Sequence, residues 1–176
     1  MSTKTGYSIT GGGGKGYINI GGWNTTLTNV STAQAEVPGI KRREGANVYF
    51  YGKQGTLSIE GGGQFVTFGD MATDGIGTLI TPVTFTAGAA LASTDNAFIV
   101  RAMTIQSMPG AVYGWYFVEG ITTITMGTSA SQALGGFACV SAASANVWQS
   151  STTTAQAVLL TAVASGEAGL AVVKLM

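Results

Sequence analysis

The chain has 176 residues, and only 9% of them are charged, against about 25% in an ordinary soluble domain. Eight Lys and Arg residues balance eight Asp and Glu residues, and there is no His, which excludes a Ser-His-Asp triad, a Cys-His dyad and any His-ligated zinc site. A single Cys cannot close a disulfide within the chain. The apolar fraction of 45% favours a folded chain, and the length suits one domain or two small ones.

The low charge also predicts how the surface is used. A protein that stays free in solution normally has a charged, mixed surface, whereas this chain would present mainly Thr, Ser, Ala and Gly. Such a surface suits packing against neighbours in a shell, a fibre or a tube. Zero net charge argues against nucleic acid as a partner, and no stretch has the pattern of a secretion signal or a membrane helix. We therefore expect a protein made in a cytoplasm, with no nucleic acid or membrane as partner.

The charges are unevenly placed along the chain. Residues 1–43 carry five basic side chains against Glu36 alone, whereas residues 44–176 carry three basic and seven acidic side chains. Three of the basic residues are consecutive: Lys41, Arg42 and Arg43. This run is either a solvated loop or part of an arm that docks on an acidic partner surface by screened electrostatic attraction.

Residues 1–36 predict an extended N-terminal arm. The glycine run at 11–14 disfavours a helix, and residues 17–20 alternate as in one short strand. Three aromatic side chains are widely spaced along the arm: Tyr7, Tyr17 and Trp23. The arm either anchors on another subunit or frays as an ordinary terminus does.

From residue 37 onward the pattern is mainly β. Segments rich in Val, Ile, Thr and aromatic residues alternate with Gly and Pro turn signals at intervals of about 8–12 residues, which indicates a compact β-sandwich or β-barrel domain over 37–176. The expected strands cover residues 48–51, 57–60, 64–68, 78–85, 97–105, 113–119, 121–126, 137–141, 147–149, 157–163 and 170–175.

Two places in this pattern require a choice. Glu119 and Gly120 separate two expected strands and predict a bend or tight turn, with a bulge at Thr122 and Thr123 restoring the alternation that follows. Residues 152–165 also fit a helix, since their apolar residues recur at helical spacing between a Thr-rich start and a Gly. We prefer a strand there, because it forms a hairpin with the final strand.

Several motifs suggest chemistry without the context that the chemistry needs. Residues 11–16 match a dinucleotide-binding fingerprint, but a strand pattern follows them in place of the required helix. Asp70 and Asp74 are expected to be turn residues rather than a catalytic pair or a calcium loop. Cys139 and the methionines at 71, 103, 108 and 126 stand in contexts that predict packing. We therefore expect no enzyme activity, no cofactor and no metal site.

Three stretches resemble a known family. Residues 45–53 and 112–120 have aromatic strands bounded by Gly, and residues 168–175 have an Ala- and Val-rich closing strand. Together they are similar to the capsid decoration, or cement, proteins of tailed bacteriophages, although the long Gly-rich leader departs from that pattern. The resemblance implies a β domain on the capsid exterior of the virion that clamps the major capsid protein lattice and stabilises it, as a homo-oligomer such as a dimer or trimer.

On this hypothesis the arm and the basic run contact the capsid. The expected contact residues are Tyr7, Tyr17, Trp23, Lys41, Arg42 and Arg43. A tail-tube, tail-fibre or head–tail joining protein is the first alternative. A carbohydrate-binding β module that uses Trp115 or Trp148 is the second.

Overall fold

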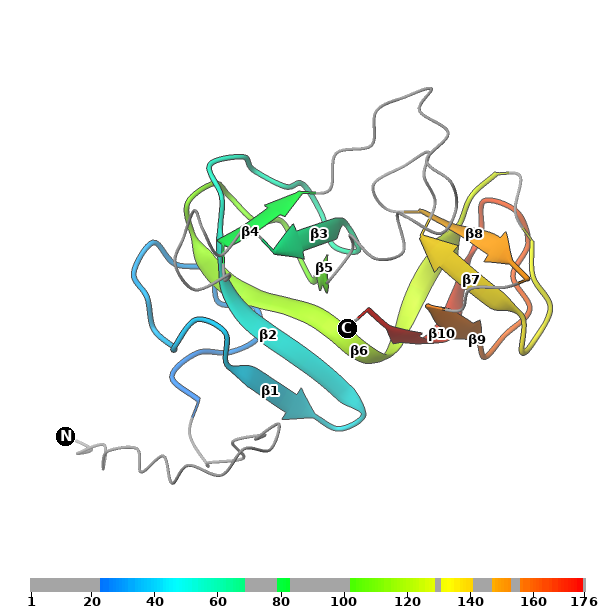
Figure 1. Cartoon of the computed structure of the whole chain (residues 1–176), viewed down its shortest axis with the longest axis horizontal. Helices are drawn as coiled ribbons and strands as arrows, with labels where there is room; N and C mark the ends of the chain where they lie inside the picture. The colour runs from blue at the N-terminus through cyan, green and yellow to red at the C-terminus, as the bar shows by residue number, and fades with distance from the viewer. Residues whose placement is uncertain are drawn as a thin grey trace.

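The computed structural model describes residues 23–68, 79–82, 102–128, 131–140, 147–152 and 156–175. Within these ranges the protein is all-β, and no helix is long and apolar enough to cross a membrane. Ten strands belong to one continuous hydrogen-bonded sheet (Figure 1). They are β1 (Lys41–Glu44), β2 (Asn47–Gln54), β3 (Phe65–Phe68), β4 (Leu79–Pro82), β5 (Ala102–Thr104), β6 (Tyr113–Met126), β7 (Phe137–Val140), β8 (Val147–Ser151), β9 (Ala157–Leu159) and β10 (Ala168–Lys174).

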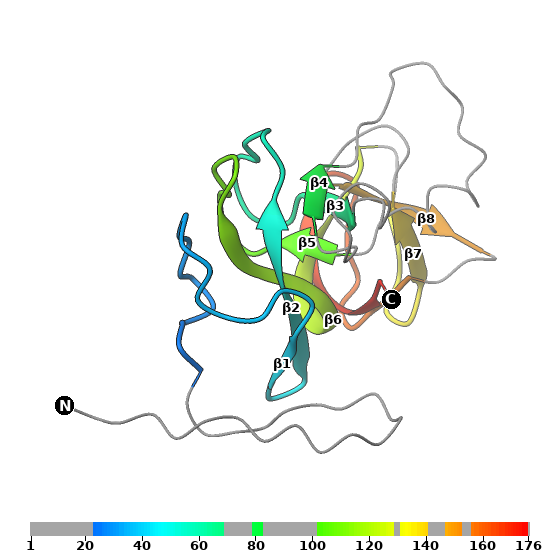
Figure 2. The same cartoon turned by 60° about the vertical axis from the view of Figure 1, so that its left-hand side comes forward.

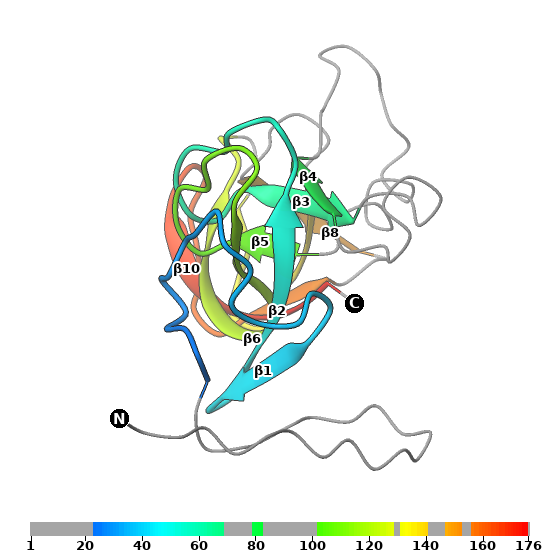
Figure 3. The ribbon, with the colours of Figure 1, turned by 90° about the vertical axis from the view of Figure 1, so that its left-hand side faces the viewer.

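The sheet closes on itself twice. Going round the first barrel, β2 pairs with β4 in parallel, and β4–β3, β3–β5, β5–β6 and β6–β2 pair antiparallel. Going round the second, β6 pairs with β8 in parallel, and β8–β7, β7–β9, β9–β10 and β10–β6 pair antiparallel. The fold is thus two five-stranded barrels that share β6, which runs between them in Figure 1, and Figure 3 shows the molecule from the side of the first barrel.

The two barrels have the same strand connections. In each, the first strand pairs in parallel with the third and antiparallel with the fifth, so β2–β6 and β6–β10 are two copies of one topology. An isolated backbone bridge repeats as well: Ile59 pairs with Met108 in the first barrel, and Gln132 pairs with Val163 in the second. The second half of the chain therefore repeats the architecture of the first.

A close glycine contact shows how detailed this repeat is. Gly114 lies six residues after Met108, and a Cβ at Gly114 would come within 2.6 Å of the Met108 Cε. Gly169 lies six residues after Val163, and a Cβ there would overlap the Val163 side chain. In each barrel, a glycine at the start of the fifth strand therefore leaves room for the side chain of a bridge residue, Met108 in the first barrel and Val163 in the second.

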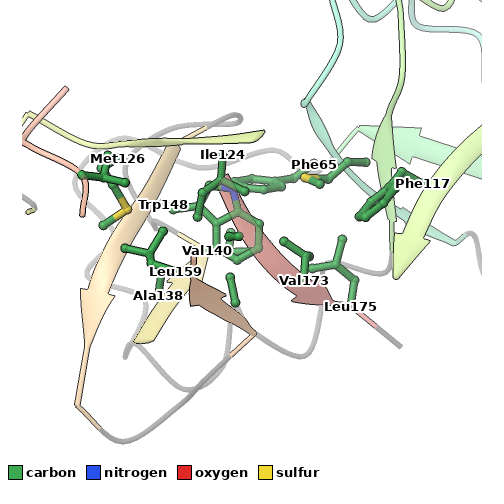
Figure 4. Packing of buried hydrophobic residues seen from close by; sticks show 14 residues of the cluster. Phe65, Phe117, Ile124, Met126, Ala138, Val140, Trp148, Leu159, Val173 and Leu175 are labelled. Atoms are coloured by element: carbon green, nitrogen blue, oxygen red, sulfur yellow. The ribbon is translucent and has the colours of Figure 1, made fainter. Parts of the chain in front are cut away.

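Two clusters of buried side chains fill the fold. One occupies the first barrel and includes Phe50 and Tyr116, which lie opposite each other on β2 and β6. The other fills the second barrel and extends across the junction, where Phe65 of β3 meets the Trp148 ring edge-on at 5.5 Å (Figure 4). Phe117 belongs to this second cluster. The first half of β6 is consequently buried on both faces.

Of the bend or tight turn expected at Glu119 and Gly120, the tight turn is wrong, because β6 continues through both residues. Gly120 has a φ of 131°, and a Cβ there would collide with Ala46 and Asn47 in the β1–β2 turn. Glycine at this place lets the strand continue rather than end. The irregularity falls between Val48 and Tyr49 of β2, not at the predicted bulge site.

The other strand predictions are confirmed only in part. The strand preferred over a helix within 152–165 is confirmed as β9, and the closing strand is confirmed as β10. The strand expected at 57–60 is wrong, since only the Ile59 bridge forms there. β1 was not predicted at all, because its charged sequence has no apolar alternation.

Candidate functional surfaces

The segment from Trp23 to Glu36 packs on the outer face of β2 and β6. The Trp23 ring meets the Trp115 ring edge-on at 5.3 Å, and the Trp115 Nε1 donates a 2.9 Å hydrogen bond to the Thr25 Oγ1. The backbone of Ser31 bridges Tyr113 at the start of β6. Figure 2 shows this segment, in blue, passing along the first barrel. We call residues 23–36 the strap.

Arg42 holds the strap to the barrel. Its guanidinium lies 5.4 Å from the Trp23 ring centre and 5.6 Å from that of Trp115, a cation–π arrangement with both rings. Its Nη1 donates a 2.8 Å hydrogen bond to the Thr25 carbonyl oxygen, and it forms an ion pair with Glu44. The side chain is only 12% exposed. The Arg42 side chain therefore makes these contacts within its own chain.

A buried carboxylate fixes the start of the strap. Glu36 is 6% exposed, and its Oε1 accepts hydrogen bonds from the backbone nitrogens of Asn24 at 2.5 Å and Thr25 at 3.1 Å. Hydrogen bonds to a charged acceptor are the stronger kind. At the other end of the strap, the Ala35 nitrogen donates to the Tyr51 hydroxyl at 3.2 Å. The strap is thus bound to the first barrel through both polar and aromatic contacts.

The structure separates the predicted contact residues. Tyr7 and Tyr17 lie outside the described residues. Because side chains alternate along a strand, Arg42 turns toward the tryptophans, whereas its neighbour Arg43 is exposed and Lys41 is half-buried. A capsid contact stays a prediction for all six residues. The described part of the N-terminal region, residues 23–36, is a packed strap.

The structure also shows a second candidate surface, which the sequence analysis did not predict. On the outside of the second barrel, Ile121 of β6 pairs with Val172 of β10, Val172 with Val158 of β9, and Val158 with Phe137 of β7. These side chains are exposed or half-buried, and they form one apolar row across four strands. We call this surface the barrel-2 face. It consists of Ile121, Phe137, Val158, Leu160, Leu170 and Val172.

The barrel-2 face was hidden from the sequence because it draws on distant segments. A strand that alternates apolar and polar residues shows that one face is buried, but not which of its outward residues meet those of another strand. Only the register across β6, β10, β9 and β7 brings these side chains together. A contiguous exposed apolar patch on a protein surface is typical of an interaction site.

The other residues considered as possible sites are either buried or outside the described residues. Trp115 and Trp148 are both fully buried, so neither ring offers a face to a sugar. Cys139 is buried with its Sγ near the Gln149 amide, which confirms it as a core residue. Asp70, Asp74 and the 11–16 motif lie outside the described residues. Within the part that the structure describes, no three His, Cys, Asp or Glu residues gather in a way that could hold a metal.

Comparisons with known proteins give a likeness in structure but none in sequence. No protein-family model matches the chain, and no curated protein matches its sequence. Among solved structures, the chain is similar to the crystal structure of the head fiber gp8.5 N base in bacteriophage phi29. The TM-score is 0.47 with 8% sequence identity, over 73% of this chain and 95% of that one.

Proposed function

We propose that this chain is a structural protein of a bacteriophage particle, which decorates the outer surface of the assembled head and stabilises it. The observation that carries the proposal is the barrel-2 face, an exposed apolar surface on a charge-poor protein whose two barrels are closed and filled. Such a surface suits a protein that is covered by neighbours when it works.

The three stretches that resemble decoration proteins are neighbours in the fold. Its three stretches, 45–53, 112–120 and 168–175, contain β2, the first half of β6 and β10. In the structure β6 pairs with both β2 and β10, so these stretches lie side by side. The resemblance thus covers one continuous part of the fold rather than three unrelated strands.

The mechanism that we propose is mass action on the assembled shell. A protein that binds the assembled lattice and not its loose subunits lowers the free energy of the assembled state. Lys41 and Arg43, on β1, supply basic side chains for an acidic shell surface, whereas Arg42 holds the strap. The protein performs no catalysis and needs no cofactor in this role.

Co-sedimentation with undecorated capsid shells tests the proposal. We expect saturable binding of the full chain, and weaker binding when Lys41 and Arg43 are both changed to Ala, with the difference shrinking at high salt. Arg43→Lys is the matched control, because it keeps the charge. If the full chain does not bind shells at any salt concentration, the decoration role is wrong.

Tail proteins are the alternative that the same experiment separates. A tail-tube or tail-fibre protein is expected to ignore empty heads and to appear on tails when intact particles are viewed by electron microscopy. Labelling of the tail, with no binding to shells, would move the proposed function to that class.

A further inference from the structure

Each side chain of the barrel-2 face has a counterpart in the first barrel. Gly114 and Gly169 hold equivalent positions, so Phe117 and Val172, each three residues further along, correspond to each other. From Phe117, the strand register leads to a row of four side chains: Tyr49, Phe117, Met103 and Phe65. From Val172, the same steps lead to Ile121, Val172, Val158 and Phe137. The apolar row of the barrel-2 face therefore repeats a row of the first barrel.

In the first barrel, this row is covered by the other barrel of the same chain. All four of its side chains lie in or against the cluster that fills the second barrel. The contact is direct, since the Phe65 ring meets the Trp148 ring edge-on at 5.5 Å (Figure 4). Ile105, the counterpart of Leu160, packs against the same cluster. A row of this kind is thus covered by a folded barrel.

In the second barrel, the corresponding row is uncovered. Ile121, Phe137 and Val172 are 39%, 44% and 42% exposed. No third barrel follows in the part of the chain that the structure describes. Leu170 alone differs, since its counterpart in the first barrel, Trp115, lies under the strap. The repeat therefore indicates that a folded surface of another molecule covers the row.

We propose that the barrel-2 face binds the barrel-2 face of a second copy of this chain, in a dimer with two-fold symmetry. A two-fold contact uses the same patch on both copies. Among the described residues, three large apolar side chains outside this face are exposed: Val37 before β1, Leu57 after β2 and Leu134 before β7. They stand in three separate loops and form no row across strands. The same face on another copy is therefore the described surface that matches this one.

Two opposite charges border the apolar row and fit the same arrangement. Glu119 of β6 lies opposite Lys174 of β10, two positions beyond the pair of Ile121 and Val172 and so on the same side of the sheet. A two-fold axis that runs between these strands and parallel to them places Glu119 against Lys174 of the other copy. It also places Ile121 against Val172 of the other copy. Charge pairs of this kind fix the orientation of two partners more than they add affinity.

The size of the face predicts a reversible dimer. Five of its six side chains are about 40% exposed, so each copy offers about 400 Å² of apolar surface, about half of what one partner buries in a standard interface. We therefore expect a dimer that dissociates on dilution.

The dimer deepens the function proposed above, on which its capsid setting rests, because it names a second decoration protein as the neighbour that covers this face. Lys41 and Arg43 lie on β1, which pairs with β2 of the first barrel, so they stay available to the shell. The test below uses no capsid shells, so its result does not depend on that function.

Sedimentation velocity of the purified full chain, over a range of concentrations, tests the inference. We expect the full chain to form a dimer as the concentration rises. Ile121→Thr/Val172→Thr should stay monomeric over the same range, because it removes two apolar side chains and keeps β-favouring residues in their place. Leu57→Thr, at an exposed site between β2 and β3, is the matched control and should dimerise as the full chain does.

Charge reversal tests the symmetry of the contact. Lys174→Glu and Glu119→Lys should each raise the dissociation constant of the dimer by about tenfold, because each variant places like charges opposite each other at two places. An equal mixture of the two variants should associate about as tightly as the full chain, because opposite charges then meet at both places.

Three outcomes would overturn the inference. A full chain that stays monomeric at every concentration would mean that the face is covered within one molecule or by another protein. A dimer that persists in Ile121→Thr/Val172→Thr would mean that the copies meet through another surface. A mixture of the charge variants that associates no more tightly than either one alone, while circular dichroism shows both folded, would exclude the two-fold contact.

Discussion

At the scale of single residues, small side chains and positive φ angles determine where the chain turns and where two segments can lie close together. Ala111, with a φ of 60°, and Gly166, with a φ of 77°, stand three residues after the bridge residues Met108 and Val163. Both barrels thus turn into their fifth strand through a left-handed residue. Only one of the two is glycine, but Ala111 directly follows Pro109 and Gly110, so the sequence carries a turn signal in both barrels.

The contact between Gly169 and Val163 gives a direct test of packing. Gly169→Ala places a Cβ against the Val163 side chain, and we expect a loss of about 2 kcal/mol in the free energy of unfolding, measured in urea. In the double variant with Val163→Ala the two losses should not add, because the smaller side chain makes room. Gly127→Ala is the control, since its Cβ would make only ordinary contacts. Additive losses would contradict the proposed overlap.

Tyr116 couples stability to high pH. Burial raises the pKa of the Tyr116 hydroxyl above its ordinary value of about 10, and the hydroxyl donates a 2.9 Å hydrogen bond to the Gln54 Oε1. The folded chain therefore holds this proton more tightly than the unfolded chain does. This stabilising contribution is complete below pH about 10 and is lost as the pH rises above it.

We expect the free energy of unfolding to fall above pH about 10, and the fall to be shallower in Tyr116→Phe. The variant should itself lose about 1–2 kcal/mol at neutral pH, because the Gln54 Oε1 loses its donor. Urea unfolding at a series of pH values measures both effects. Equal pH slopes in the two proteins would exclude Tyr116 as the source.

At the scale of elements, the strap and β1 depend on contacts that the local sequence does not show. Glycine-rich, weakly apolar sequence predicts an arm, and this was the expectation for residues 1–36. The described part, 23–36, is held by hydrogen bonds from Asn24 and Thr25 to Glu36 within the strap, and by contacts of Trp23 and Arg42 with Trp115. Trp115 lies on β6, far along the chain, so these contacts cannot be predicted from the local sequence.

Truncation separates the strap from the residues before it. Removing residues 1–43 takes away the cover of Trp115 and most of β1, and we expect the free energy of unfolding to fall by about 3 kcal/mol or more. Removing residues 1–22 leaves these contacts in place and should change stability little. Thermal unfolding of the two truncated chains measures the difference. Equal stability would show that the strap contributes nothing to the fold.

At the scale of the whole molecule, the shared strand joins the two barrels. β6 supplies the fifth strand of one and the first strand of the other, and Phe65 of the first barrel packs on Trp148 of the second. Because both barrels contain β6, detachment of this strand would open both of them. The architecture therefore predicts one cooperative unfolding transition.

Core variants in the two barrels test this cooperativity. Val66→Ala in the first barrel and Leu159→Ala in the second should each lower the free energy of unfolding by about 2–3 kcal/mol. In each variant, tryptophan fluorescence and far-ultraviolet circular dichroism should shift together as one transition. A variant that moves only part of the signal would show that the barrels unfold separately.

The sequence by itself determined the class of the fold and much of the core. Alternating β-branched and aromatic residues between glycine turns predicted the mainly-β domain, and the apolar surroundings of Cys139 predicted its burial, because these signals are local. Only the tertiary structure decided that β6 continues through Gly120, that the strands close into two barrels, and that Ile121, Val172 and Phe137 lie in one row. These features depend on pairing between segments far apart in the chain. A local sequence pattern can show that a segment forms a strand, but it does not specify which other strand its backbone will hydrogen-bond to.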